Sequence, residues 1–217
     1  MRTLFIATIF TAHFSFGQIS LLALDEVKKT DKYLFYLHGA IVQEMGVNAV
    51  SEDFGAYEYL KIVNTFSEHN FKVISEARPK GTDVVGYAKK ISSQIDTLLS
   101  KGVQPDHITV VGASQGAYIA IEAAHLQKNQ KIRYVIMALC NDYNVNFYSQ
   151  YSGELCGNFL SIYEASDQKL SCNRLLNNMT CKSGYEEIKL SMGNGHGFIF
   201  KPYPEWVTPI VKWINKK

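Results

Sequence analysis

The stretch ITVVGASQGAYIAIEAA, residues 108–124, changes from a strand pattern to a helix pattern across one small turn. Its first four residues have the β-branched composition of a buried parallel strand. Residues 118–124 have the composition of a mostly buried helix. The five residues between them, 112–116, have Ser114 at their centre. We therefore expect an α/β fold organised around this turn.

The turn Gly-Ala-Ser-Gln-Gly matches the G-x-S-x-G elbow, in which a strained backbone holds a serine hydroxyl away from the strand end. Ser114 also stands at the start of a helix, where free N–H groups and the positive dipole end favour a developing oxyanion. The backbone N–H of Gln115 is the expected oxyanion donor. The alternative is that Ser114 simply caps the helix, so the evidence for a nucleophile has to come from the rest of the chain.

Strand and helix patterns alternate along the remaining sequence. Strands are expected at residues 19–24, 33–37, 71–75, 108–111, 134–139, 159–163 and 185–191, and helices at residues 57–70, 84–101, 169–177 and 206–214. This alternation predicts a three-layer α/β sandwich, with a mostly parallel central sheet and helices on both faces. The chain has 217 residues and no repeat or linker. Residues 18–217 are therefore expected to form one domain, which would bury about 70% of its unfolded surface.

Two further side chains fit the chemistry of Ser114. Asp167 comes just after the expected strand at residues 159–163, where a carboxylate can orient an imidazole; the alternative is a helix N-cap. His196 lies in the loop MGNGHGF beyond the last strand, and this glycine-rich setting suits a general base. Asp142 also follows a strand. We prefer Asp167, because the tyrosine-rich segment that contains Asp142 looks better suited to shaping a pocket.

The expected strand at residues 33–37 ends in His-Gly-Ala. A tight turn in that position directs backbone N–H groups into a site, so Ala40, or failing it Ile41, is the expected second oxyanion donor. Ile41 is also a candidate for substrate contact. His38 is expected to be structural, hydrogen-bonded within the turn.

Other candidates for substrate binding come from two loops. Arg78 follows a strand and is a candidate for binding an acidic substrate group, but we favour an ion pair with Glu76 or another loop carboxylate. Residues 141–157 are expected to form a long irregular connection. Its Tyr143 and Tyr148 could line an acyl or aromatic pocket, or simply pack the loop. This connection is too short for a substantial cap domain, which favours an open site.

Residues 1–17 have the pattern of a secretory signal peptide, with one positive charge followed by a short apolar run and small residues. We expect cleavage after Gly17 and a periplasmic or secreted protein without a membrane segment. The balance of 22 basic and 20 acidic residues, with no basic run, argues against nucleic acid or anionic membranes as partners.

The four cysteines agree with export, because an even number in an exported chain indicates two disulfides. Three connectivities are open. Closure of short loops favours Cys140 with Cys156 and Cys172 with Cys181. The spacing lacks the C-x₂-C pairs of a typical zinc site, so no metal is expected. Asn178 begins a glycosylation sequon, which matters only in a host that glycosylates.

The order Ser114, Asp167, His196 resembles the nucleophile, acid and base order of the α/β-hydrolases. The motifs LHGA, GASQG, EASD and GNGHG look like that superfamily's oxyanion strand end, elbow, acid turn and histidine loop. Within it, the chain resembles the small capless esterases and the dienelactone-hydrolase-like enzymes, although Ser114 departs from the cysteine nucleophile of the latter. Compared with the full family sheet, the N-terminal strands are shortened in this sequence, so we expect six parallel strands and one antiparallel edge.

The resemblance implies a serine hydrolase that cleaves small-molecule carboxylic esters through an acyl-enzyme, without a metal or organic cofactor. Two other functions stay open. A serine peptidase on the same fold would need a site for the substrate chain, for which Arg78 and Glu76 are the visible candidates. A secreted binding protein that keeps the fold would not react with a fluorophosphonate probe.

Overall fold

A computed structural model describes residues 18–19, 27–151 and 153–216 of the chain. The predicted signal peptide, residues 1–17, lies outside the described residues. The predicted first strand, residues 19–24, lies mostly outside them too. Its described start belongs to β1 (Gln18–Ile19), which pairs antiparallel with β5 (Phe71–Glu76).

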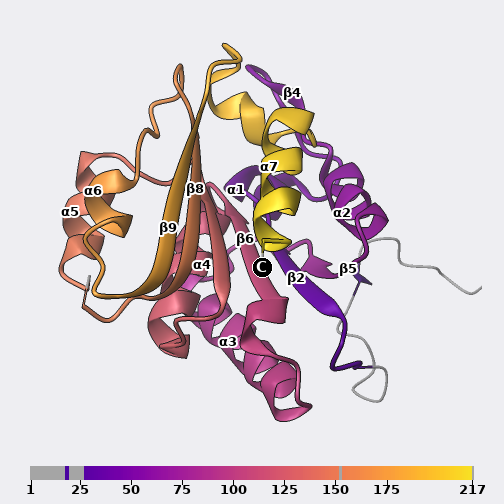
Figure 1. Ribbon diagram of the computed structural model, residues 1–217. Helices are drawn as coiled ribbons and strands as arrows, with labels where there is room; N and C mark the ends of the chain where they lie inside the picture. Colours follow the sequence, from indigo (N-terminus) through magenta and orange to yellow (C-terminus); the bar gives the residue numbers. More distant parts are fainter. Residues whose placement is uncertain (1–17, 20–26, 152, 217) are drawn as a thin grey trace, which may run out of the picture.

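The structure is built on a seven-stranded sheet in the order β1-β5-β2-β6-β7-β8-β9 (Figure 1). Its other strands are β2 (Lys32–Leu37), β6 (Ile108–Ala113), β7 (Arg133–Met137), β8 (Cys156–Glu164) and β9 (Cys181–Leu190). Every pair from β5 to β9 is parallel, so six parallel strands carry one antiparallel edge. This confirms the predicted sheet. A small separate hairpin joins β3 (Val50–Ser51) to β4 (Gly55–Ala56).

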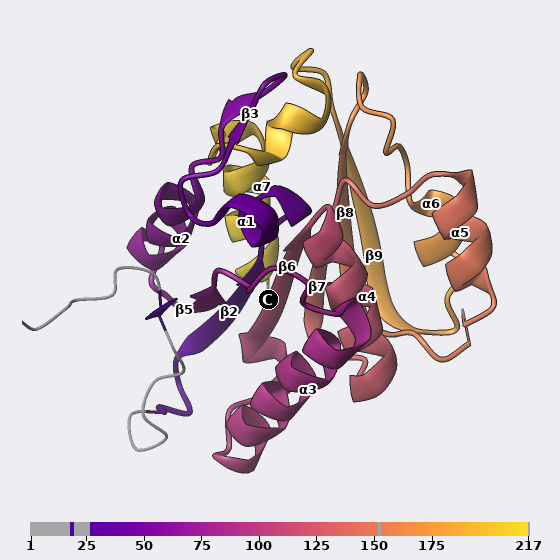
Figure 2. The same ribbon diagram turned by 180° about the vertical axis from the view of Figure 1, so that it is seen from behind.

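Helices cover both faces of the sheet, which confirms the three-layer prediction (Figures 1 and 2). One face carries α3 (Val84–Ser100) and α4 (Gln115–Gln127), and the other carries α1 (Ala40–Met45), α2 (Tyr59–Glu68) and α7 (Pro204–Ile214). The side chains of β2 alternate between two cores: Tyr33 and Phe35 pack with α3 and α4, whereas Leu34 and Tyr36 pack with α2 and α7. This alternation follows from the two-residue period of a strand.

The segment 141–157 is not the irregular connection that the sequence predicts. It contains α5 (Asp142–Ser149), beside the short α6 (Asn173–Leu176) at the edge of the molecule (Figure 2). Asn141 caps α5, because its side chain accepts a hydrogen bond from the N–H of Asn144 at 2.9 Å. This cap is a helix start signal that the sequence reading missed. The helix α6 is also shorter than the predicted helix at residues 169–177, because Leu170 forms a strand-like bridge with Cys140 instead of joining the helix.

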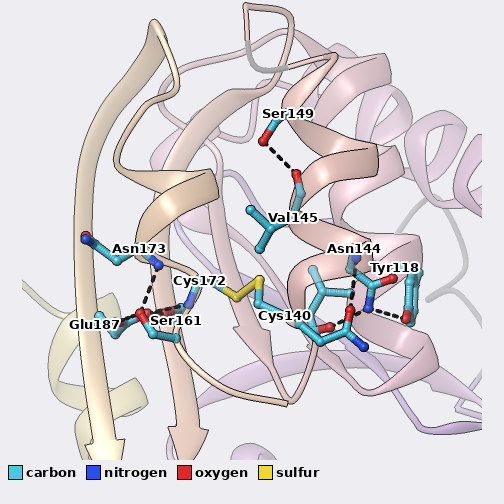
Figure 3. The surroundings of a disulfide bond; sticks show 12 residues. Tyr118, Cys140, Asn144, Val145, Ser149, Ser161, Cys172, Asn173 and Glu187 are labelled. Carbon is cyan, nitrogen blue, oxygen red and sulfur yellow. Dashed lines mark hydrogen bonds between the residues drawn. A yellow bond between two sulfur atoms is a disulfide. The ribbon is translucent and has the colours of Figure 1, made fainter. Parts of the chain in front are cut away.

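The two disulfides join Cys140 to Cys172 and Cys156 to Cys181. The predicted pairing is therefore wrong. Loop length favoured near neighbours in sequence, but strand register decides the bridges: Cys156 and Cys181 are direct partners at the start of the parallel pair β8 and β9, with Cα atoms 4.6 Å apart. The other bridge joins the residue before α6 to the segment between β7 and α5, with Cα atoms 5.2 Å apart (Figure 3).

A half-buried carboxylate supports this second bridge. Glu187 of β9 accepts the N–H of Cys172 at 2.8 Å and the hydroxyls of Ser161, Ser171 and Tyr185. Figure 3 shows Glu187 beside Ser161 and the Cys172 backbone. Burial alone would raise the pKa of Glu187, but these hydrogen bonds outweigh it and hold the pKa below its usual value. The carboxylate therefore ties the disulfide segment to the sheet.

Candidate active site

Ser114, Asp167 and His196 meet at the carboxyl edge of the sheet, where parallel strands deliver the residues that follow them. Ser114 follows β6, Asp167 follows β8, and His196 lies in the short 3₁₀ turn Gly195–Ile199 after β9. The imidazole bridges the other two: Nε2 is 3.0 Å from Ser114 Oγ, and Nδ1 is 2.9 Å from Asp167 Oδ2. The structure thus brings together the three residues that the sequence predicted as a triad.

The bridge defines the protonation pattern that this geometry favours. A carboxylate accepts hydrogen bonds only, so Nδ1 of His196 donates to Asp167. Nε2 is then the unprotonated nitrogen and accepts the hydroxyl hydrogen of Ser114. The Asp167 side chain is 4% exposed and the His196 side chain 27% exposed. The carboxylate is therefore shielded from water, while the imidazole edge stays accessible.

The backbone around Ser114 has the strain of an elbow. Its φ is +53° and ψ is −115°, a region that non-glycine residues rarely adopt. The turn is sterically feasible only because residues 112 and 116 are glycines. A Cβ atom on Gly116 would lie 1.9 Å from the carbonyl oxygen of Leu37. A Cβ atom on Gly112 would lie 2.4 Å from the carbonyl oxygen of Gly116. The Ser114 side chain makes no capping hydrogen bond to α4. The helix-cap alternative therefore does not explain this serine.

Ala40 and Gln115 are the first residues of α1 and α4, so neither backbone N–H has an acceptor within its helix. The two helices start close together, because a Cβ on Gly39 would lie 3.5 Å from the Cβ of Ser114. His38 Nδ1 donates to the carbonyl oxygen of Gly39 at 2.8 Å. In a planar trans peptide the carbonyl and the next N–H point in opposite directions, so the N–H of Ala40 points away from the buried His38 ring.

His38 has a structural place in this turn. Its ring is fully buried, and its Nε2 accepts the N–H of Arg78 at 2.9 Å. Burial first, and then the charge of Arg78, lower the pKa of His38 to about 3. The ring is neutral at physiological pH, and both of its nitrogens are occupied. These contacts agree with the structural role that the sequence favoured over a catalytic one.

Arg78 forms no ion pair with Glu76 or with any other carboxylate of the described residues, so the favoured ion pair is not observed there. Glu76 instead accepts hydrogen bonds from Tyr87 and Lys90. Nor is the guanidinium open to a substrate, because Arg78 is 2% exposed. Its hydrogen bonds go to His38, Gln43 and Gln115, which surround the start of α1 and α4. The sequence placed Arg78 correctly beside this edge of the sheet, but its partners come from elements that only the fold brings together.

Glu164 is a residue beside the site that the sequence reading missed. It is fully buried at the end of β8 and accepts hydrogen bonds from the N–H groups of Ser166, Met192 and Gly193 and from the Ser166 hydroxyl. Burial alone would raise the pKa of Glu164, but these bonds outweigh it and lower the pKa. Ser166 Oγ also accepts the N–H of Gly195 at 3.0 Å. Glu164 and Ser166 together therefore hold the acid turn against the histidine loop.

The remaining candidates, Ile41, Tyr143 and Tyr148, share no hydrogen bond or ion pair with the triad among the described residues. Ile41 is half-buried on α1 and packs into the core beside α2 and α7. Tyr143 is 76% exposed. Tyr148 is buried between α4 and α5, at a cavity of about 340 Å³ whose described lining includes none of the triad residues. A hollow of about 460 Å³ lies instead beside the histidine loop, lined by Asp53, Phe54, Ser166, Gly193, Asn194, Gly195, Gly197 and Tyr203.

No group of three or more His, Cys, Asp or Glu side chains in the described part of the chain is arranged to hold a metal ion. No helix within the described ranges is long and apolar enough to cross a membrane.

No protein-family model and no curated protein sequence matches the chain. Solved structures do match it. SOBER1 from Arabidopsis thaliana superposes with a TM-score of 0.57 at 13% identity, over 86% of this chain and 100% of that one. A cold-adapted esterase from an Arctic intertidal metagenomic library gives 0.56 at 13%, over 86% and 82%. A monoacylglycerol lipase from Paleococcus ferrophilus gives 0.55 at 15%, over 84% and 93%. The chain therefore has the α/β-hydrolase fold that its motifs predicted.

Proposed function

We propose that this protein is a serine hydrolase that cleaves small-molecule carboxylic esters through an acyl-enzyme. One observation carries the proposal: a single imidazole lies within hydrogen-bond distance of both a strained serine hydroxyl and a buried carboxylate. The solved structures with the same fold include an esterase and a monoacylglycerol lipase. This likeness agrees with ester hydrolysis but does not carry the assignment.

In the proposed mechanism, His196 Nε2 takes the hydroxyl proton as Ser114 Oγ attacks the ester carbonyl. The carbonyl oxygen becomes an oxyanion, held by the N–H groups of Ala40 and Gln115. The bond to the alcohol oxygen then breaks, and the leaving alcohol takes the proton from His196. Asp167 stabilises the imidazolium that forms in between. Water, activated by the same imidazole, attacks the acyl-enzyme, releases the carboxylic acid and restores Ser114.

The proposal includes export as a single domain of residues 18–217 after removal of residues 1–17. The two disulfides fit an oxidising compartment, as expected for a periplasmic or secreted protein. N-terminal sequencing of the exported protein tests the cleavage site directly. We expect the mature chain to begin at Gln18.

Fluorophosphonate labelling and a panel of p-nitrophenyl esters and peptides test the catalytic proposal. We expect the wild type to be labelled at Ser114 and to turn over esters faster than peptide amides. Ser114→Ala should remove the labelling and reduce turnover about 10⁶-fold, as nucleophile removal does in a comparable triad. Near wild-type turnover by the folded variant would reject the proposal, and labelling with faster amide turnover would instead favour a peptidase.

A further inference from the structure

Arg78 carries a buried positive charge that no carboxylate of the described residues balances. The residue is 2% exposed, and none of the hydrogen bonds or ion pairs of its side chain involves an acid. Glu76, the acid nearest in sequence, is occupied by Tyr87 and Lys90. Burial lowers the pKa of Arg78, but an arginine starts from so high a value that it stays charged.

Such an arrangement is costly for folding. An unpaired charge in a protein interior loses its hydration, and neutral acceptors replace that hydration only in part. One guanidinium nitrogen, Nη1, is buried and has no hydrogen-bond partner among the described residues. The face of the Tyr87 ring, 5.5 Å from the guanidinium carbon, gives a weak compensation. Stability alone therefore does not account for an arginine at this position.

The acceptors of Arg78 belong to the elements that would form the oxyanion hole. Nη2 donates to the carbonyl oxygen of His38 at 2.5 Å and to Gln115 Oε1 at 3.2 Å, and Nε donates to Gln43 Oε1 at 3.1 Å. His38 precedes α1, Gln43 lies within α1, and Gln115 begins α4. One planar guanidinium therefore links the start of both helices.

The guanidinium also lies directly behind the elbow. A Cβ on Gly116 would lie 2.9 Å from the His38 carbonyl oxygen, which is the same atom that Nη2 binds. The backbone N–H of Arg78 donates to His38 Nε2, which leaves Nδ1 as the donor to the Gly39 carbonyl. The main chain of residue 78 thus fixes the His38 ring, and through it the direction of the peptide whose N–H belongs to Ala40. The guanidinium adds what only the arginine side chain supplies, which is a hold on the adjoining peptide through the His38 carbonyl oxygen.

We propose that Arg78 is a positioning residue of the oxyanion hole, where it orients the N–H groups of Ala40 and Gln115 and places an unbalanced positive charge behind them. The inference rests on the proposed function, and it replaces the idea that Arg78 binds an acidic substrate group.

The physical reason is a difference between ground state and transition state. The ester carbonyl is neutral when the substrate binds, so a buried cation behind the donors contributes little to KM. The tetrahedral intermediate carries a full negative charge on that oxygen, and a fixed cation in a water-poor site stabilises it without reorganisation. Loss of Arg78 should therefore lower kcat and leave KM for an uncharged ester nearly unchanged.

The test compares Arg78→Met and Arg78→Lys with Arg133→Met as the matched control. Arg133 is half-buried, whereas Arg78 is buried, but it too lies beside an aromatic ring and donates to main-chain carbonyl oxygens, those of Ile214 and Lys216. It begins β7, at the opposite end of the sheet. Each variant is measured for kcat and KM on p-nitrophenyl acetate and for inhibition by a trifluoromethyl ketone, whose adduct with serine carries an oxyanion.

We expect Arg78→Met to lose about 10²-fold in kcat and a similar factor in ketone affinity, with KM within about twofold, on the scale of one lost oxyanion donor. Arg78→Lys keeps the charge but cannot hold three acceptors in one plane, so it should lose about tenfold in both quantities. Arg133→Met should lower the melting temperature and leave both quantities unchanged.

Wild-type kcat and ketone affinity in folded Arg78→Met would overturn this inference and leave the proposed function intact. If Arg78→Met does not fold, wild-type values in Arg78→Lys would overturn it equally. A loss confined to KM, and only for esters that carry a carboxylate, would restore the substrate-binding role. Absence of turnover and of fluorophosphonate labelling in the wild type would overturn the proposed function, and this inference with it.

Discussion

The choice of triad acid leads to the sharpest prediction, because two aspartates follow neighbouring strands and the structure separates them. Asp167 has a side chain that is 4% exposed, and its Oδ2 lies 2.9 Å from His196 Nδ1. Asp142 has a side chain that is 89% exposed, and it pairs with Arg174 at 2.7 Å. Asp167→Asn and Asp142→Asn are therefore a matched pair: the same chemical change, once at the imidazole and once at the surface.

The expected loss for Asp167→Asn is up to about 10⁴-fold in kcat, about 5.4 kcal/mol of transition-state stabilisation at about 1.36 kcal/mol per factor of ten. The asparagine removes the negative charge that stabilises the imidazolium. Its amide can also donate to Nδ1, which would place the proton on Nε2 and leave His196 unable to accept from Ser114. Because Asp167 is shielded from water, no solvent molecule readily substitutes for it.

For Asp142→Asn we expect kcat within about twofold of wild type. An exposed ion pair contributes about 0–1 kcal/mol to stability, and Asp142 does not contact the imidazole. Both variants are assayed with one activated ester after circular dichroism has shown equal folding, and active sites are counted with a fluorophosphonate. The reverse ranking, or a loss below tenfold in folded Asp167→Asn, would refute the assignment of Asp167 as the acid.

Three further predictions concern two hydrogen-bonded carboxylates and the two disulfides. Glu164→Gln should lower kcat about tenfold or more, because it loosens the acid turn against the histidine loop. The matched change Glu187→Gln should lower the melting temperature and leave kcat unchanged. Equal effects of the two changes on kcat would contradict the role given to Glu164. The folded-state pKa values of both glutamates lie below the usual 4.5, so each carboxylate stabilises the fold above that pH and loses its contribution as the pH falls through the folded pKa. Urea unfolding between pH 7 and pH 3 should show this drop, and a stability independent of pH would argue against it. Non-reducing peptide mapping should find the bridges Cys140–Cys172 and Cys156–Cys181, and loss of the second through Cys181→Ser should cost about 2–5 kcal/mol in chemical denaturation.

The sequence by itself determined the fold class and the three residues that meet at the candidate site. The reason is that these features depend on local pattern and on one general rule of α/β sheets. A β-branched run followed by Gly-Ala-Ser-Gln-Gly specifies a strand and a sharp turn from neighbouring residues alone. Ser114, Asp167 and His196 each follow a strand, and parallel strands deliver their carboxyl ends to one edge of the sheet. Their meeting could therefore be predicted without knowing the strand order.

Only the tertiary structure decided which residues pair across elements distant in sequence. Cys156 bonds to Cys181 because the register of β8 on β9 makes them partners, and loop length carries no information on register. Arg78 binds Gln43 and Gln115 rather than the nearby Glu76, because the fold places the first turns of α1 and α4 beside its guanidinium. Glu164 likewise hydrogen-bonds to both the acid turn and the histidine loop because the sheet brings these two loops together. Such contacts depend on distances between elements, which a single sequence does not contain.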